Sequence, residues 1–101
     1  MSGVSYPYAY WYETVATSQT AQVLGVTGAK GDYVHRLIVV AANATASNVT
    51  LIDGSTSIVI TGATTPVGTY SFELNMAAAT GPWKITTGSG VTVIAVGIFT
   101  A

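Results

Sequence analysis

The side chains that could carry out chemistry in this sequence are few. His35 is the single histidine, and the sequence contains no cysteine. A Ser-His-Asp relay or a metal site would therefore have to use this one imidazole. Asp32 lies three residues before His35, so in an extended strand the two side chains would point to opposite faces. The spacing predicts a polar residue at a strand end or at a subunit contact. A metal would find enough ligands only where a threefold axis gathered three copies of His35.

The carboxylates show no pattern that is typical of catalysis. They are spread along the chain as Glu13, Asp32, Asp53 and Glu73. A glycosidase needs two carboxyl groups roughly 5 to 9.5 Å apart, and Asp53 already belongs with Gly54 to a dipeptide typical of a hairpin turn. The glycine-containing segments 28–31 and 88–90 open no helix and match neither P-loop nor Rossmann spacing, so we interpret them as turns. We predict a protein that is not an enzyme and needs no cofactor or metal.

Charge and hydropathy argue against two classes of partner. The 101 residues include three cations and four anions, a net charge of −1, and only 7% of them are charged. A protein that neutralises several phosphates needs clustered Lys or Arg, so we expect no nucleic-acid partner. The longest aliphatic run, 37–42, is far shorter than the roughly 18 residues of a membrane-spanning helix, so we expect no membrane partner. The first residues lack a secretory pattern, and we expect synthesis in a cytoplasm.

The elements that would position these side chains are short strands. Segments rich in Thr and Val alternate with turn residues at spacings near ten residues, without an amphipathic helix. This pattern predicts an all-β protein, a single β-sandwich of seven or eight short antiparallel strands that is jelly-roll-like or alternatively immunoglobulin-like. The strands are expected at residues 12–17, 20–27, 33–41, 48–52, 55–61 and 69–76, with two more within 82–100.

Two turns are expected to organise these strands. Asp53-Gly54 predicts a type I′ turn between the strands on either side of it. Gly88-Ser89-Gly90 predicts the turn of a C-terminal hairpin, whose first strand carries Trp83. We expect Trp83 to fill the core together with Ile85.

The last strand is apolar on both faces, because side chains alternate with a period of two. One face holds Val91, Val93, Ala95 and Phe99, and the other holds Ile94, Val96 and Ile98. An antiparallel sheet in a small domain normally shows water a polar outer face. One apolar face can serve the core, and the other needs a cover, which we expect to be a neighbouring subunit. The run 37–42 is likewise apolar on both faces. The residues predicted to make these contacts are Ile38, Val40, Ile94, Val96 and Ile98.

The first twelve residues form a predicted aromatic arm, followed by a sandwich domain over 13–101. Its tyrosines are spaced by two, at Tyr6, Tyr8, Tyr10 and Tyr12, with Trp11 among them. In an extended arm the four tyrosine rings would share one side, where they could cover apolar surface while their hydroxyls reach polar partners. We interpret the arm as docking on another subunit or a scaffold. The alternatives are a first strand that pairs within its own domain and a platform that stacks on sugars.

Several strand and turn segments carry a resemblance to a known family. The segment Gly81-Pro82-Trp83-Lys84-Ile85-Thr86-Thr87-Gly88, the strand 91–100 and the upstream Leu51-Ile52-Asp53-Gly54-Ser55 resemble small virion structural proteins of tailed bacteriophages. The resemblance covers roughly residues 32–100, and its motifs are strand and turn signals. It implies a capsid decoration, or cement, protein: a compact β-sandwich, commonly trimeric, that sits on the outside of the head and bridges major capsid subunits without a cofactor.

The expected partners are therefore the chain itself, as a homotrimer, and the major capsid protein of a phage head. The expected location is the capsid surface of the virion, after synthesis in the bacterial host cytoplasm. Two other functions remain open from the sequence. One is the base of a head fibre or a tail-associated β domain, and the other is a carbohydrate-binding module.

Overall fold

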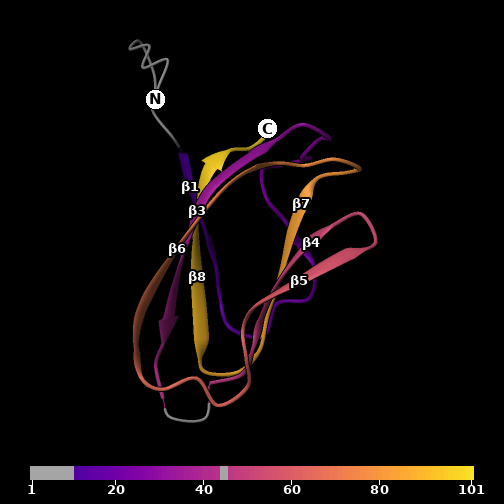
Figure 1. Cartoon of the computed structure of the whole chain (residues 1–101). Helices are drawn as coiled ribbons and strands as arrows, with labels where there is room; N and C mark the ends of the chain where they lie inside the picture. The colour runs from indigo at the N-terminus through magenta and orange to yellow at the C-terminus, as the bar shows by residue number, and fades with distance from the viewer. Residues whose placement is uncertain (1–10, 44–45) are drawn as a thin grey trace.

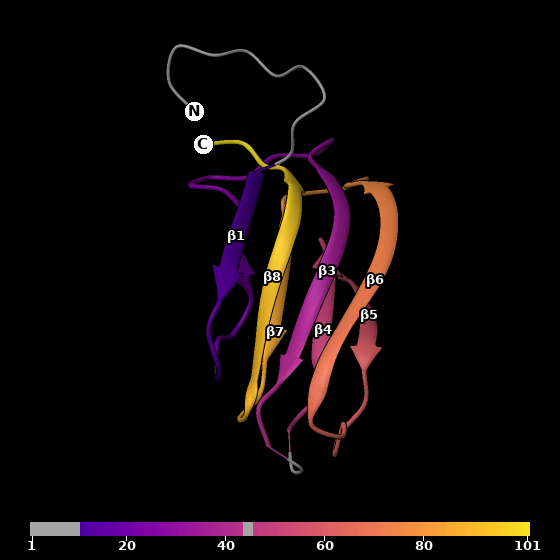
Figure 2. The same cartoon turned by 90° about the vertical axis from the view of Figure 1, so that its left-hand side faces the viewer.

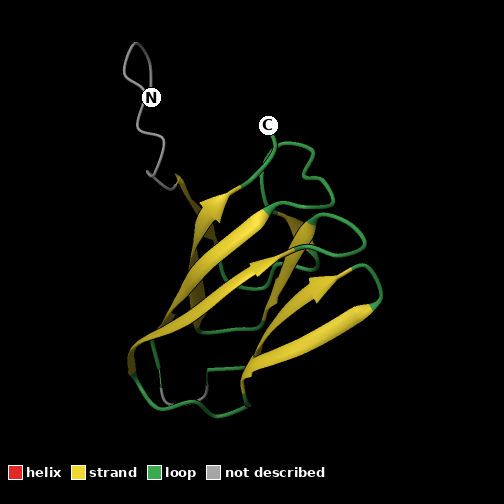
Figure 3. Ribbon diagram, turned by 45° about the horizontal axis from the view of Figure 1, so that its top comes forward, coloured by secondary structure: helices red, strands yellow, loops and turns green. Residues whose placement is uncertain are grey.

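The computed structural model describes residues 11–43 and 46–101, and these residues form strands and loops without a helix (Figure 3). Two four-stranded antiparallel sheets pack against each other as a β-sandwich (Figure 1). The all-β sandwich predicted from the alternation is confirmed. The strands are β1 (Trp11–Val15), β2 (Gln22–Val23), β3 (Tyr33–Ala41), β4 (Val49–Asp53), β5 (Thr56–Thr61), β6 (Gly68–Ala77), β7 (Trp83–Thr87) and β8 (Val91–Ile98). In this described part of the chain there is no helix able to cross a bilayer.

The strand order is that of a jelly roll. One sheet runs β1-β8-β3-β6 and the other runs β2-β7-β4-β5. The pairs β4–β5, β3–β6, β2–β7 and β1–β8 are nested around one turn, like a long hairpin folded over into two layers. The pairs β3–β8 and β4–β7 then join the two halves of each sheet. This order confirms the jelly-roll-like prediction.

The turn at the centre of this nested hairpin follows Asp53. Asp53 is the last residue of β4 and pairs with Thr56, so the loop consists of Gly54 and Ser55. Only Gly54 has a positive φ, of 61°. A positive φ at the first loop residue alone is the pattern of a type II′ turn, so the predicted type I′ turn was wrong. The predicted hairpin itself is confirmed.

The predicted C-terminal hairpin was wrong. Both strands form, but β7 belongs to one sheet and β8 to the other, so the connection between them crosses the sandwich. Backbone hydrogen bonds anchor this connection, because Ser47 N donates to Ser89 O at 2.9 Å and Ala42 N donates to Gly90 O at 2.8 Å. Two consecutive apolar strands can bury their inward faces from opposite sheets as well as from one sheet. Local alternation therefore does not distinguish a crossing connection from a hairpin.

The second strand is much shorter than the predicted segment 20–27. Ala21 and Gly25 lie on either side of β2 with φ values of 47° and 88°, and such values interrupt extended backbone. Leu24 N nevertheless donates to Trp83 O at 2.9 Å, which keeps this segment beside β7. The Leu24 side chain is fully buried. The segment therefore serves the core without being a regular strand.

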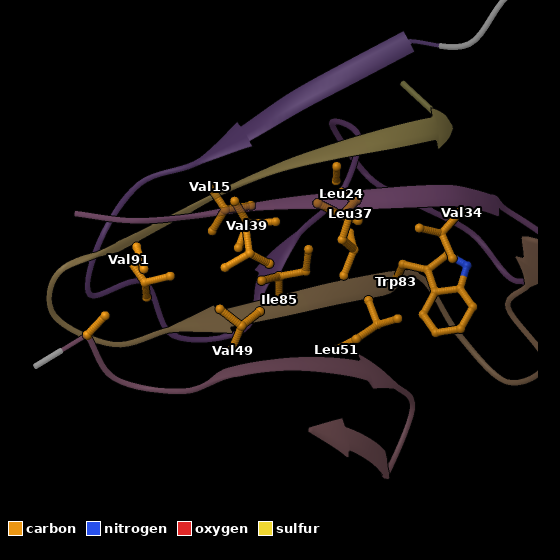
Figure 4. Packing of buried hydrophobic residues seen from close by; sticks show 14 of the residues in the cluster. Val15, Leu24, Val34, Leu37, Val39, Val49, Leu51, Trp83, Ile85 and Val91 are labelled. Carbon is orange, nitrogen blue, oxygen red and sulfur yellow. The ribbon is translucent and has the colours of Figure 1, made fainter. Parts of the chain in front are cut away.

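The core lies between the two sheets (Figure 4). Alternate side chains of the central strands meet there, Leu37 and Val93 from one sheet against Leu51 and Ile85 from the other, and all four are fully buried. Trp83 is 2% exposed, and its indole Nε1 donates to the Asp32 carbonyl oxygen at 2.9 Å. The predicted core role of Trp83 with Ile85 is confirmed.

Candidate interaction surface

The outward side chains of β3 and β8 form one aliphatic patch on the β1-β8-β3-β6 sheet. The strand register places Ile38 opposite Ile94, Arg36 opposite Val96 and Val40 opposite Thr92. The residues between them point into the core and are buried. The central strands therefore carry two apolar faces, as predicted. We call the outward set the outer aliphatic face, which consists of Ile38, Val40, Ile94 and Val96.

No described segment covers the outer aliphatic face. Its four side chains are half-buried, because neighbours within the same sheet shield them. Figure 2 views this sheet with β1, β8, β3 and β6 side by side, and the second sheet lies behind it. The face thus has on its outer side no second layer from residues 11–43 or 46–101.

The aliphatic patch reaches the edge strand β1 and the end of β8. Tyr12 pairs with Val96 and Thr14 with Ile94, so both β1 side chains lie on the same outer side. Tyr12 is 72% exposed and Ile98, at the end of β8, is 48% exposed. The other edge strand differs, because the outward residues of β6 are polar. They include Thr69, Ser71, Glu73 and Asn75.

The predicted arm is only partly described. Tyr6, Tyr8 and Tyr10 lie outside the described residues. Trp11 and Tyr12 belong to β1, so the sheet includes two residues that the sequence assigned to the arm. Trp11 pairs with Gly97, one position away from the Tyr12–Val96 pair. The two side chains therefore point to opposite faces of β1 and do not form a shared stacking platform.

Arg36 is the residue of this surface that sequence reasoning missed. It shares the period-two row of Ile38 and Val40, and this spacing was the available signal. Its Nη2 lies 3.7 Å from Glu73 Oε1, which is an ion pair at the long end of the range, and its buried Nε has no hydrogen-bond partner. The guanidinium is a cation on the rim of an apolar surface, and such a cation suits a partner that offers a carboxylate or carbonyl oxygen.

A bulge in β3 separates Arg36 from the polar end of the sheet. The register of β3 shifts between Val34 and Arg36 relative to both neighbouring strands. Next to the bulge, Asn75 has a φ of 52°, and its Oδ1 lies 2.9 Å from His35 Nδ1 and accepts from Tyr33 OH at 2.7 Å. His35 is thus a polar residue near a strand end, as predicted.

Three carboxylates accept hydrogen bonds from backbone N–H groups of loops and hold those loops in place. Glu13 accepts from Gly25 N at 2.7 Å and from Gln22 Nε2 at 2.8 Å. Asp32 accepts from Ala29 N and Thr100 N, both at 2.9 Å. Each carboxylate thereby supplies acceptors to a loop that would otherwise leave backbone donors unpaired.

Asp53 makes the most extensive of these loop contacts. It accepts from Ala79 N at 2.8 Å and from Thr80 N and Gly81 N at 3.2 and 3.1 Å. The hydrogen bond from Ala79, followed by those from Thr80 and Gly81, holds the pKa of Asp53 below its ordinary value despite an opposing contribution from desolvation. Asp53 therefore has a second role besides its position next to the turn.

The described residues hold no pocket and no cluster of three or more His, Cys, Asp or Glu side chains suited to a metal ion. Comparison of the chain with family models, with curated proteins and with solved structures found no match. The outer aliphatic face is therefore the candidate interaction surface. The second sheet differs, because the outward residues of its central strands include Thr50, Thr86 and Lys84 beside Ile52.

Proposed function

We propose that the chain is a structural protein of a bacteriophage virion, which decorates the outside of the head and stabilises the contacts between major capsid subunits. One observation carries the proposal: the central strands of one sheet present four aliphatic side chains outward with no described segment over them. The resemblance to small virion proteins supplies the kind of partner. In this role the protein acts by contact and carries out no turnover, and the homotrimer is part of the same proposal.

The mechanism follows from mass action. A subunit that binds only the assembled shell stabilises that state by its free energy of binding. Apolar surface contributes about 25 cal/mol per Å² buried, before the costs of association are subtracted. The half-buried side chains of the outer aliphatic face have part of their surface left to bury. Many copies with weak individual contacts would together stabilise a shell.

Only 7% of the chain is charged, which fits this role. An average soluble domain has roughly 25% charged residues. A surface with so few charges is poorly hydrated, and burial against partners removes that cost. Arg36, the cation on the rim of the aliphatic face, would add orientation through a carboxylate of the shell protein.

The test compares one substitution on each sheet. Ile94→Lys places a charge in the centre of the outer aliphatic face, and Thr50→Lys places the same charge at an outward, half-buried position in a central strand of the other sheet. Heads depleted of the protein are titrated with each variant. We expect Ile94→Lys to weaken binding at least about tenfold, because burying an unpaired charge is unfavourable, while Thr50→Lys binds like the unmodified chain. Equal affinities would overturn the proposed contact surface.

Antibody labelling of intact particles tests the location. We expect label distributed over the heads of the phage that encodes the chain. Label restricted to a head vertex or to the tail would overturn decoration in favour of a fibre base or tail-associated domain. Unlabelled particles would overturn the virion assignment.

A further inference from the structure

The two long sides of the sandwich are not equally closed. On the side of β5 and β6, the inward apolar side chains pack against the core but stay only partly buried. We call this set the open side, which consists of Ile58, Ile60, Tyr70, Phe72, Leu74 and Met76. Figure 2 shows β5 behind β6 at this side of the molecule. A further apolar layer here would complete the core.

The edge of β6 is free to pair with another strand. β6 is ten residues long and pairs with β3, and no described strand lies on its other side. Unpaired N–H and C=O groups along such an edge form a template for an added strand. The inward row of β6 is apolar at every second residue, from Tyr70 to Met76. An added strand would therefore need apolar side chains with the same period to extend that row over the open side.

The residues before β1 have this period. Tyr6, Tyr8 and Tyr10 are spaced by two, and Pro7 lies between them. In a strand, alternate residues direct their side chains to the same face of the sheet. The same residues direct their backbone N–H and C=O groups to the same edge of the strand. β6 bonds to β3 through its inward residues, so the N–H and C=O groups at its free edge belong to its outward residues. A strand that runs parallel to β6 and hydrogen-bonds to it through its even-numbered residues would therefore place the three rings over the open side. The missing N–H of Pro7 would then face away from β6, where an edge strand tolerates proline.

The reach of the chain decides which copy supplies the segment. β1 and β6 are the two edges of one sheet, with β8 and β3 between them. At about 4.8 Å per strand, a strand added beyond β6 lies ~19 Å from β1. Tyr10 immediately precedes β1, and Tyr8 is only three residues, or about 10 Å of extended chain, from Trp11. These tyrosines cannot reach β6 of their own subunit.

We propose that residues 1–10 of one copy add a β-strand to the β6 edge of a neighbouring copy and cover its open side with Tyr6, Tyr8 and Tyr10. The contact is head-to-tail, because the donor surface and the acceptor surface differ. Such contacts close into rings, of which a trimer is one. The inference concerns contacts between copies of this chain and stands independently of the capsid role.

The test uses the full chain and a variant that carries Tyr6→Ser, Tyr8→Ser and Tyr10→Ser. Native mass spectrometry gives the oligomeric state, and hydrogen exchange gives the protection of the β6 amides. We expect the unmodified chain to be a closed oligomer with protected β6 edge amides. The triple variant should be monomeric, and exchange at those amides should rise at least about tenfold. Thermal unfolding reports whether the sandwich remains folded.

A matched control carries Ser5→Lys and Ala9→Lys. These odd-numbered side chains would face away from the open side, so the control should keep the oligomer. A monomeric unmodified chain, a triple variant that keeps its oligomer, or β6 amides that exchange equally fast in both proteins would overturn the proposal. Failure of capsid binding in the preceding tests would leave these measurements unaffected. A monomeric unmodified chain would overturn this proposal together with the homotrimer of the proposed function, whereas the other two outcomes concern this proposal alone.

Discussion

The two long sides of this jelly roll finish the same core in different ways. On the side of β1 and β2, Val15 and Leu24 are fully buried, and Glu13 connects β1 to the backbone of Gly25. On the side of β5 and β6, the inward side chains keep part of their surface accessible. A chain of 101 residues has a high ratio of surface to volume. The comparison shows that one core can be closed to different degrees at its two sides.

The largest expected effect is the difference in stability lost when a buried and a half-buried leucine are each replaced by alanine. Leu24→Ala removes a fully buried side chain from the closed side, and we expect it to lower the free energy of unfolding by about 3 kcal/mol. Leu74→Ala makes the same change on the open side and should cost only about 1 kcal/mol, because less surface is lost and water can fill the space. Urea unfolding of both variants measures the difference. Equal costs would mean that the two sides are equally closed.

The next effect concerns the hydrogen bonds of Glu13 on the side of β1 and β2. Glu13→Ala removes the acceptor of Gly25 N and Gln22 Nε2, and we expect a loss of about 1 to 2 kcal/mol in the free energy of unfolding. Glu13→Gln keeps an acceptor and should lose less. Glu73→Ala is the matched control on the open-side edge strand, since its exposed pair with Arg36 should contribute no more than about 0.5 kcal/mol. If Glu13→Ala unfolds at the same urea concentration as the Glu73 variant, Glu13 does not close that side.

The smallest effect is a pH dependence at the loop that crosses from β6 to β7. Because the pKa of Asp53 is lowered in the folded chain, its contribution to stability is fully present above the ordinary pKa of an aspartate. That contribution is lost as the pH falls through the lowered value. We expect the midpoint of thermal unfolding of the unmodified chain to fall as the pH is lowered from about 5 to about 2. Asp53→Asn should flatten the profile, and an unchanged acid limb would contradict the assignment.

Much of the fold follows from local chemistry. The alternation in β6 separates a partly buried apolar row from an exposed polar row. The Asp53-Gly54 dipeptide predicted a hairpin, although the type of its turn depends on where β4 ends. β3 was predicted with its observed bounds, since its aliphatic run ends at a polar loop. The bulge at His35 was not predicted, because it depends on two neighbouring strands. Gly97 lies opposite it, and a Cβ there would collide with the Tyr33 carbonyl oxygen.

The candidate interaction surface could also be predicted only in part from the sequence. Period-two alternation was sufficient to predict that Ile38 and Ile94 would have no place in the core. Their position side by side on one outer face depends on the pairing of β3 with β8, which are about fifty residues apart in the sequence. The position of Arg36 on the rim of that face depends on the same pairing.

The sequence by itself determined which segments are extended, where the chain turns, and that more apolar strand surface exists than one core can bury. These properties arise from neighbouring residues, whose side chains and backbone angles act over short distances. Only the tertiary structure decided that β7 and β8 lie in different sheets, that the chain is nested around a single turn, and that one side stays open. Strands with the same alternation can pair in many orders, and only the packing of the whole chain selects among them.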